Sequence, residues 1–111
     1  MYSNTMCMYE KNKILIMISN VIVIVNIDSF EITKIKIKGI GHTRCICPLS
    51  NNNYLIGNNC GKAFKFNLDD IINIYNKRPE NNIRIAKIPN LGIFSFSKKK
   101  KFFSFNILKK F

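Results

Sequence analysis

The chain has 111 residues, enough for one domain, and its 47% hydrophobic content excludes a wholly disordered or collagen-like polypeptide. Its net charge is +12, and half of this excess lies after Asn90, where six lysines occur without an acidic residue. Such a charge suits nucleic acid, anionic lipid, an acidic protein or simply a solvated surface. Four cysteines without a secretory signal before them indicate an intracellular protein, cytoplasmic or nuclear, rather than a disulfide framework.

The first forty residues contain short Ile- and Val-rich segments, several of which alternate apolar with polar positions. Such segments predict strands, since β-branched side chains pack well on a pleated surface. The apolar run Ile14–Ile27 is too short for the roughly 20 residues of a membrane-spanning helix, and Ser19-Asn20 interrupts it. Four strands are expected here: Thr5–Tyr9, Lys13–Ile18, Val21–Ile27 and Glu31–Lys38.

The next fifty residues repeat this organisation. Asn- and Gly-rich breaks at 50–53 and 59–61 have the residue types of turns. A longer connection at 69–81 is compatible with a helical turn before Pro79. The strands expected in this part are Arg44–Leu49, Tyr54–Asn58, Lys62–Leu68 and Ile83–Ile88.

The two sets of strands align with each other. Cys7 falls on Cys47 and Leu15 on Leu55, each 40 positions apart (47 minus 7, 55 minus 15). A four-stranded antiparallel unit that recurs at about forty residues is typical of a β-propeller blade. We therefore divide the chain into a blade-like repeat at 3–40, a second at 41–90 and a Lys/Phe-rich tail at 91–111.

The second repeat opens with Gly41-His42 and ends its third strand with Phe66-Asn67. In these features it resembles a WD-repeat, which opens with Gly-His and closes with Trp-Asp at the position of Phe66-Asn67. The family's hydrogen-bonded network of histidine, serine or threonine, aspartate and tryptophan is largely missing, because only His42 is retained. The resemblance covers Thr5 to about Pro89. The residues at the motif positions are Gly41, His42, Gly57, Asn59, Gly61, Phe66 and Asn67.

This resemblance implies an all-β fold with two consecutive four-stranded antiparallel blades of a WD-like β-propeller and a basic, low-complexity C-terminal tail. Two blades cannot close a ring of about 4–8 blades, so the ring is expected to be incomplete. The chain is then a fragment of a propeller or a protomer that must assemble. The implied role is a non-catalytic scaffold for protein–protein interaction, whose partners are other proteins or further blades, with no cofactor and no small-molecule substrate.

A metal or catalytic site remains an alternative. His42 with Cys45, Cys47 and Cys60 has the ligand types of a zinc site. However, Cys45 and Cys47 alternate along a strand and face one way, there is no Cys-x-x-Cys pair, and buried strand cysteines are the commoner case. A Cys–His nucleophile pair lacks any group to orient it. We therefore expect no metal site and no catalytic residues.

The tail offers a second function of a different class. Lysines with interleaved aromatic residues can bind anionic lipid or stack on single-stranded nucleic acid, although most such tails are simply solvated. The alternating Phe-Ser-Phe at 94–96 is also compatible with a strand. The candidate binding residues are Lys98, Lys99, Lys100, Lys101, Phe102 and Phe103. The alternative function is thus a small basic protein that binds an anionic membrane or nucleic acid through this segment.

Overall fold

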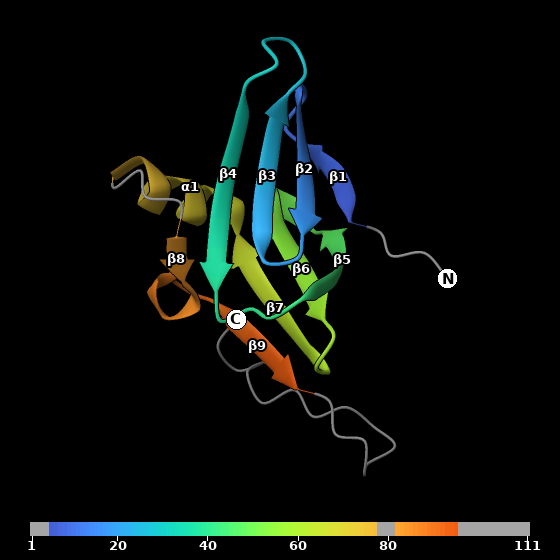
Figure 1. Ribbon diagram of the computed structural model, residues 1–111, viewed down its shortest axis with the longest axis vertical. Helices are drawn as coiled ribbons and strands as arrows, with labels where there is room; N and C mark the ends of the chain where they lie inside the picture. Colours follow the sequence, from blue (N-terminus) through green and yellow to red (C-terminus); the bar gives the residue numbers. More distant parts are fainter. Residues whose placement is uncertain (1–4, 78–81, 96–111) are drawn as a thin grey trace.

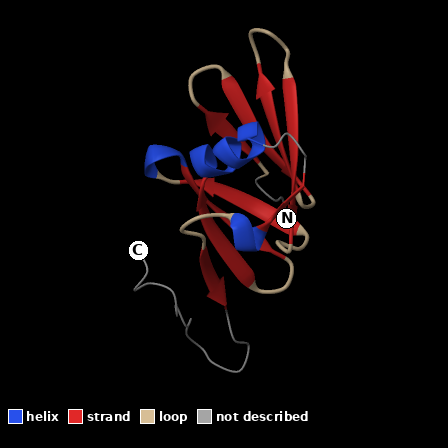
Figure 2. Ribbon diagram, turned by 90° about the vertical axis from the view of Figure 1, so that its left-hand side faces the viewer, coloured by secondary structure: helices blue, strands red, loops and turns tan. Residues whose placement is uncertain are grey.

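The computed structural model describes residues 5–77 and 82–95, and most of these residues lie in two β-sheets (Figure 1). The first predicted repeat supplies four strands of one sheet, the second supplies three strands of the other, and an α-helix lies across the sheets (Figure 2). The prediction of a mainly β protein is confirmed. The WD-like propeller is a finer assignment and stays a proposal.

The first sheet has the strand order β1-β2-β3-β4-β8. Its first four strands are antiparallel neighbours: β1 (Met6–Tyr9), β2 (Lys13–Ile18), β3 (Val21–Asn26) and β4 (Ile32–Lys38). The apolar run that could be mistaken for a membrane anchor is a β-hairpin, as predicted, and Ser19-Asn20 forms its turn.

The second sheet has the order β5-β6-β7-β9. It consists of β5 (Thr43–Pro48), β6 (Asn53–Asn58), β7 (Lys62–Asn67) and β9 (Gly92–Ser95), all antiparallel. A short 3₁₀ turn, Ser50–Asn52, joins β5 to β6. The three consecutive strands β5, β6 and β7 lie where the sequence predicted them.

The fourth strand of the second sheet is not the predicted segment Ile83–Ile88, and that prediction is wrong. Residues Asn82–Arg84 form β8, which pairs in parallel with β4 of the first sheet, and Ile85–Lys87 form a 3₁₀ turn. The buried side chain of Ile83 lies beside Ile37. Alternating Ile and polar residues predict that a strand exists, but they do not specify which sheet it joins.

β9 takes the fourth position instead, although it lies in the range assigned to the tail. Ile93 pairs with Phe64, and its side chain packs against the core. Residues 96–111 lie outside the described part of the chain.

Helix α1 (Leu68–Lys77) begins directly after β7, so Leu68 starts a helix rather than ending a strand. Asn67 precedes the helix, and its side-chain oxygen accepts a hydrogen bond from the Asp69 backbone N–H at 3.0 Å. This is the usual N-cap interaction. Leu68 and Ile71 are fully buried, so the helix is held by packing as well as by its cap.

Both sheets pair in the register that the repeat predicts. Cys7 is opposite Leu15 in the first sheet, and Cys47 is opposite Leu55 in the second. The central pairs β2–β3 and β6–β7 also correspond, with one inserted residue between them. The fourth strands depart from this spacing, because α1, β8 and the second 3₁₀ turn are inserted before β9.

The sheets pack around one common core. We call the side of each sheet that lies against this core its inner face, and the opposite side its outer face. The inner face of the first sheet carries Leu15, Met17, Ile22, Ile24, Ile35 and Ile37. The inner face of the second sheet carries Ile46, Tyr54, Ile56, Phe64 and Phe66.

Corresponding residues of the two repeats lie on opposite faces. Leu15 is on the inner face, whereas its equivalent Leu55 is on the outer face and half-buried. Conversely, Ile56 is buried in the core, whereas its equivalent Ile16 is on the outer face. The two repeats therefore stack with unlike faces in contact.

Candidate interaction surfaces

The opening motif Gly41-His42 lies in the link between the two sheets. Gly41 has φ +80°, in the left-handed region that glycine adopts readily. The His42 side chain is exposed, while its backbone carbonyl accepts a hydrogen bond from the Asn59 N–H at 3.0 Å. His42 and Asn59 are thus connected through the backbone.

The closing motif Phe66-Asn67 lies at the end of β7. Phe66 is buried and stacks on Tyr54, with ring centroids 6.1 Å apart. The Asn67 side-chain amide donates to the Asn51 carbonyl at 3.0 Å and to the Asn53 side-chain oxygen at 3.2 Å. Asn67 therefore joins the β5–β6 turn to the start of α1. His42 lies in solvent and Phe66 in the core, so the motif residues do not form one site.

The remaining motif glycines serve the β6–β7 hairpin. Gly61 has φ +75°, and the Asn58 side-chain oxygen accepts hydrogen bonds from the N–H groups of Cys60 and Lys62. Gly57 lies so close to Cys45 that an added Cβ would be 3.1 Å from its sulfur. The roles of these residues are conformational and steric.

The cysteines are not buried strand residues, and that prediction is wrong. Cys45, Cys47 and Cys60 are exposed, and Cys7 is half-buried. Cys45 and Cys47 share one face, as expected, but it is the outer face of an edge strand. Among the described residues, no three His, Cys, Asp or Glu side chains cluster closely enough to hold a metal ion.

Two tyrosines link the repeats, and the sequence did not identify either of them. The Tyr9 hydroxyl donates to the Asp69 carboxylate at 2.9 Å, and the Tyr54 hydroxyl donates to the Met8 carbonyl at 3.1 Å. Burial is the main cause that raises the pKa of Tyr54 to about 12. Burial, followed by the Asp69 carboxylate, also raises the pKa of Tyr9 well above its usual value.

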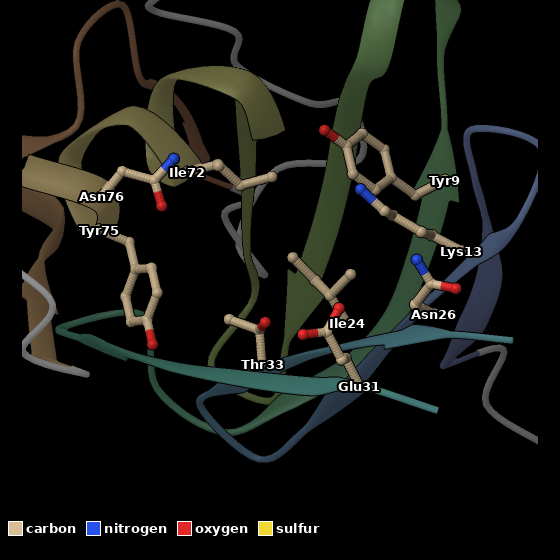
Figure 3. Close-up of a pocket in the computed structure, with 9 residues that line it drawn as sticks. All are labelled: Tyr9, Lys13, Ile24, Asn26, Glu31, Thr33, Ile72, Tyr75 and Asn76. Carbon is tan, nitrogen blue, oxygen red and sulfur yellow. The ribbon is translucent and has the colours of Figure 1, made fainter. Parts of the chain in front are cut away.

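A small cavity of about 170 Å³ opens between the first sheet and α1. Figure 3 shows Ile72, Tyr75 and Asn76 of the helix on one side of it, and residues of β1 to β4 with Glu31 on the other. It is smaller than the ~300 Å³ at which small-molecule sites usually begin. The nine lining residues are Tyr9, Lys13, Ile24, Asn26, Glu31, Thr33, Ile72, Tyr75 and Asn76.

Several polar groups of this cavity have partners within the fold. Lys13 Nζ lies 3.4 Å from the Glu10 carboxylate and 5.9 Å from the centre of the Tyr9 ring. The Asn26 side-chain oxygen accepts hydrogen bonds from the N–H groups of Asp28 and Ser29. Lys13 and Asn26 are thus held by contacts within the fold.

The outer face of the first sheet is strongly apolar over β1, β2 and β3. The exposed fractions are 54% for Met6, 52% for Met8, 58% for Ile18 and 59% for Ile32. Large contiguous apolar patches on a protein surface usually mark interaction sites. The apolar residues on this face are Met6, Met8, Ile14, Ile16, Ile18, Val21, Val23, Val25 and Ile32.

A basic margin borders this apolar area. Lys34, Lys36 and Lys38 of β4 are exposed on the same face, and Arg84 of β8 lies beside Lys38. The lysines and phenylalanines proposed for the tail site, Lys98–Lys101 with Phe102 and Phe103, lie outside the described residues.

No family model, no curated protein and no solved structure matches the chain. Of the helices in the described ranges, none combines the length and apolar character needed to span a bilayer.

Proposed function

We propose that this protein is a non-catalytic scaffold for protein–protein interaction, built as part of a WD-repeat-like β-propeller and acting in the cytoplasm or nucleus. The observation that carries this proposal is the stacking of two sheets in one repeat register with unlike faces in contact. Such stacking adds further units in the same sense, which is how radial repeats are built.

Partner proteins would bind at the turns between strands, since these turns are exposed and carry hydrogen-bonding side chains. Ser50–Asn52 and the hairpin at 58–61 project from the second sheet. Loops held by a rigid sheet are common binding positions.

Site-specific photo-crosslinking of the full chain in cells tests this role. A photoreactive residue is placed at Asn51 or Asn59, both exposed, and a matched probe replaces Lys99 in the tail. We expect discrete protein adducts from the two turn positions. Adducts from Lys99 alone, especially with lipid or nucleic acid, would contradict the scaffold role.

A second candidate function is binding of an anionic membrane or nucleic acid through Lys98–Lys101, Phe102 and Phe103. The basic margin formed by β4 and Arg84 adds an observation in its favour. Replacing the four tail lysines with serine should then weaken binding to anionic vesicles or oligonucleotides at least tenfold, and added salt should do the same. If the quadruple variant binds as tightly as the original chain, the tail lysines are not the binding site. Substitution is preferable to truncation after Asn90, because truncation would remove β9.

A further inference from the structure

We propose that the outer face of the first sheet docks onto the outer face of the second sheet of another copy of this chain, so that copies associate head to tail. This inference deepens the proposed scaffold role, on which it rests, by naming the partner as a second copy. The surface concerned is the apolar face that includes Met6, Met8 and their neighbours on β1, β2 and β3.

The two sheets carry apolar residues at equivalent positions of the repeat, but on opposite faces. Within one chain, the inner face of the second sheet already packs against another sheet, using Tyr54, Ile56, Phe64 and Phe66. The first sheet has apolar residues at the same repeat positions, but there they point outward. These residues are Ile14, Ile16, Val23 and Val25. The outer face of the first sheet thus carries the side chains suited to a contact that the second sheet already makes.

The opposing face is present on the same chain. The outer face of the second sheet carries Leu55, Ala63 and Phe94, which correspond to Leu15, Ile22 and Ile35 of the inner face of the first sheet. Leu55 and Phe94 are half-buried, and the small Ala63 between its neighbouring strands is buried. Cys47, the equivalent of Cys7, lies beside Leu55 and is exposed. Lys65 lies opposite Leu55 on this face, and the polar pair Asn53 and Asn67 lies at one end of it. Each chain therefore presents both halves of one type of interface.

An interface between two different patches is heterologous, so a free patch remains at each end of a growing assembly until a ring closes. Copies that each carry a charge of +12 repel one another, and added salt screens this repulsion. We therefore expect assembly to increase with ionic strength, which is opposite to the salt dependence expected for binding to an anionic partner.

Sedimentation velocity of single-face variants tests the arrangement. Met8→Glu with Ile18→Glu blocks the first face, and Cys47→Glu blocks the second, all at exposed positions. Phe30→Glu is the matched control, since Phe30 is 79% exposed in the β3–β4 turn. Circular dichroism checks that each variant keeps the β-rich spectrum of the original chain. If one does not, Ile32→Glu replaces the variant of the first face and Cys45→Glu the variant of the second face.

The expected result is specific to head-to-tail contact. The original chain and Phe30→Glu form species larger than a dimer, and each blocked variant alone is a monomer. An equimolar mixture of the two blocked variants forms a dimer with one copy of each and stops there. A monomeric original chain would overturn the inference, as would Cys47→Glu assembling normally or a mixture that stays monomeric. A monomer that still gives protein adducts at Asn51 would sink this docking mode and leave the scaffold role standing.

Discussion

Asn26 and Asn67 occupy equivalent positions at the ends of β3 and β7, and their side chains act alike with different results. The Asn26 side-chain oxygen accepts the N–H groups of Asp28 and Ser29 and closes a tight turn. The Asn67 side-chain oxygen accepts a hydrogen bond from the Asp69 N–H and caps the start of a ten-residue helix. Asparagine suits both positions because its side chain can replace a backbone acceptor. The residues that come after each asparagine decide between turn and helix.

Replacing Asn67 with alanine removes a cap and two bonds to the β5–β6 turn. We expect the free energy of unfolding to fall by about 1–2 kcal/mol, with a loss of helical signal in circular dichroism. Asn26→Ala is the matched control and should lower stability without that spectral change. Urea titration of both variants measures the difference. Equal loss of helical signal in the two variants would contradict the capping role.

Tyr54 gives the protein a defined alkaline sensitivity. Its pKa is about 12 in the folded state and about 10 when unfolded, so its neutral form is favoured by folding. This contribution is fully present below pH about 10 and is lost as pH rises toward 12, because the unfolded chain releases the proton first. Tyr54→Phe lacks the titrating hydroxyl, so the stability advantage of the original chain over this variant should shrink across that interval. Denaturant titrations at stepped pH measure it, and a difference independent of pH would contradict the account.

At the scale of elements, alternation and turn residues located the strands of both repeats well. Eight segments were predicted, and seven of them form strands that pair as the repeat requires, with small changes at their ends. The eighth was misplaced because Ile83 contacts β4, a partner more than forty residues earlier. The Gly92–Ser95 strand lies in the segment assigned to a solvated tail, where the alternating Phe-Ser-Phe indicated a strand only as an alternative. Local pattern does not encode such distant partners.

The burial of the cysteines was mispredicted for a related reason. Cysteine is usually buried, but β5 is an edge strand, and its register places Cys45 and Cys47 on the outer face. For the motif residues, the sequence predicted their positions in the repeat but not the contacts that they make. The role of Asn67 as a cap depends on α1, which the sequence suggested only as a helical turn, and the tyrosine links depend on how the sheets stack.

A double-mutant cycle tests the corrected placement of β8. Ile83→Ala should cost about 2–5 kcal/mol, since Ile83 is 4% exposed and part of the core. Its effect should be coupled to that of Ile37→Ala, its neighbour in the first sheet, by at least ~0.5 kcal/mol. Phe64→Ala, in β7, provides the matched comparison. A larger coupling energy between Ile83 and Phe64 than between Ile83 and Ile37 would contradict the pairing of β8 with the first sheet.

At the scale of the molecule, one core joins both sheets, and residues from the two repeats contact each other across it. Leu15 and Ile56 are both fully buried, one in each sheet. Either residue changed to alanine should lower stability by about 2–5 kcal/mol and leave a single cooperative transition. Thermal unfolding followed by tyrosine fluorescence and by circular dichroism checks this. Two separated transitions would indicate repeats that fold independently.

The same packing explains why the outer surfaces are unlike those of a self-contained domain. Each inner face is covered by the other repeat, while the equivalent residues on the outer faces keep the character of a core. Met6 and Ile16 of the first sheet, for example, are equivalent to the buried Ile46 and Ile56 of the second sheet. A scaffold that extends by adding sheets would use this surface. The proposed scaffold role and the proposed docking mode both depend on the stacking of sheets through unlike faces.

Nuclear Overhauser effects in isotopically labelled protein test most directly whether the two repeats share one register and stack through unlike faces. We expect cross-strand contacts between Cys7 and Leu15 and between Cys47 and Leu55, with the side chain of Leu15, but not that of Ile16, close to the second sheet. Helical contacts through Ile14–Ile27, or contacts from Ile16 rather than Leu15 to the second sheet in the monomer, would contradict the account.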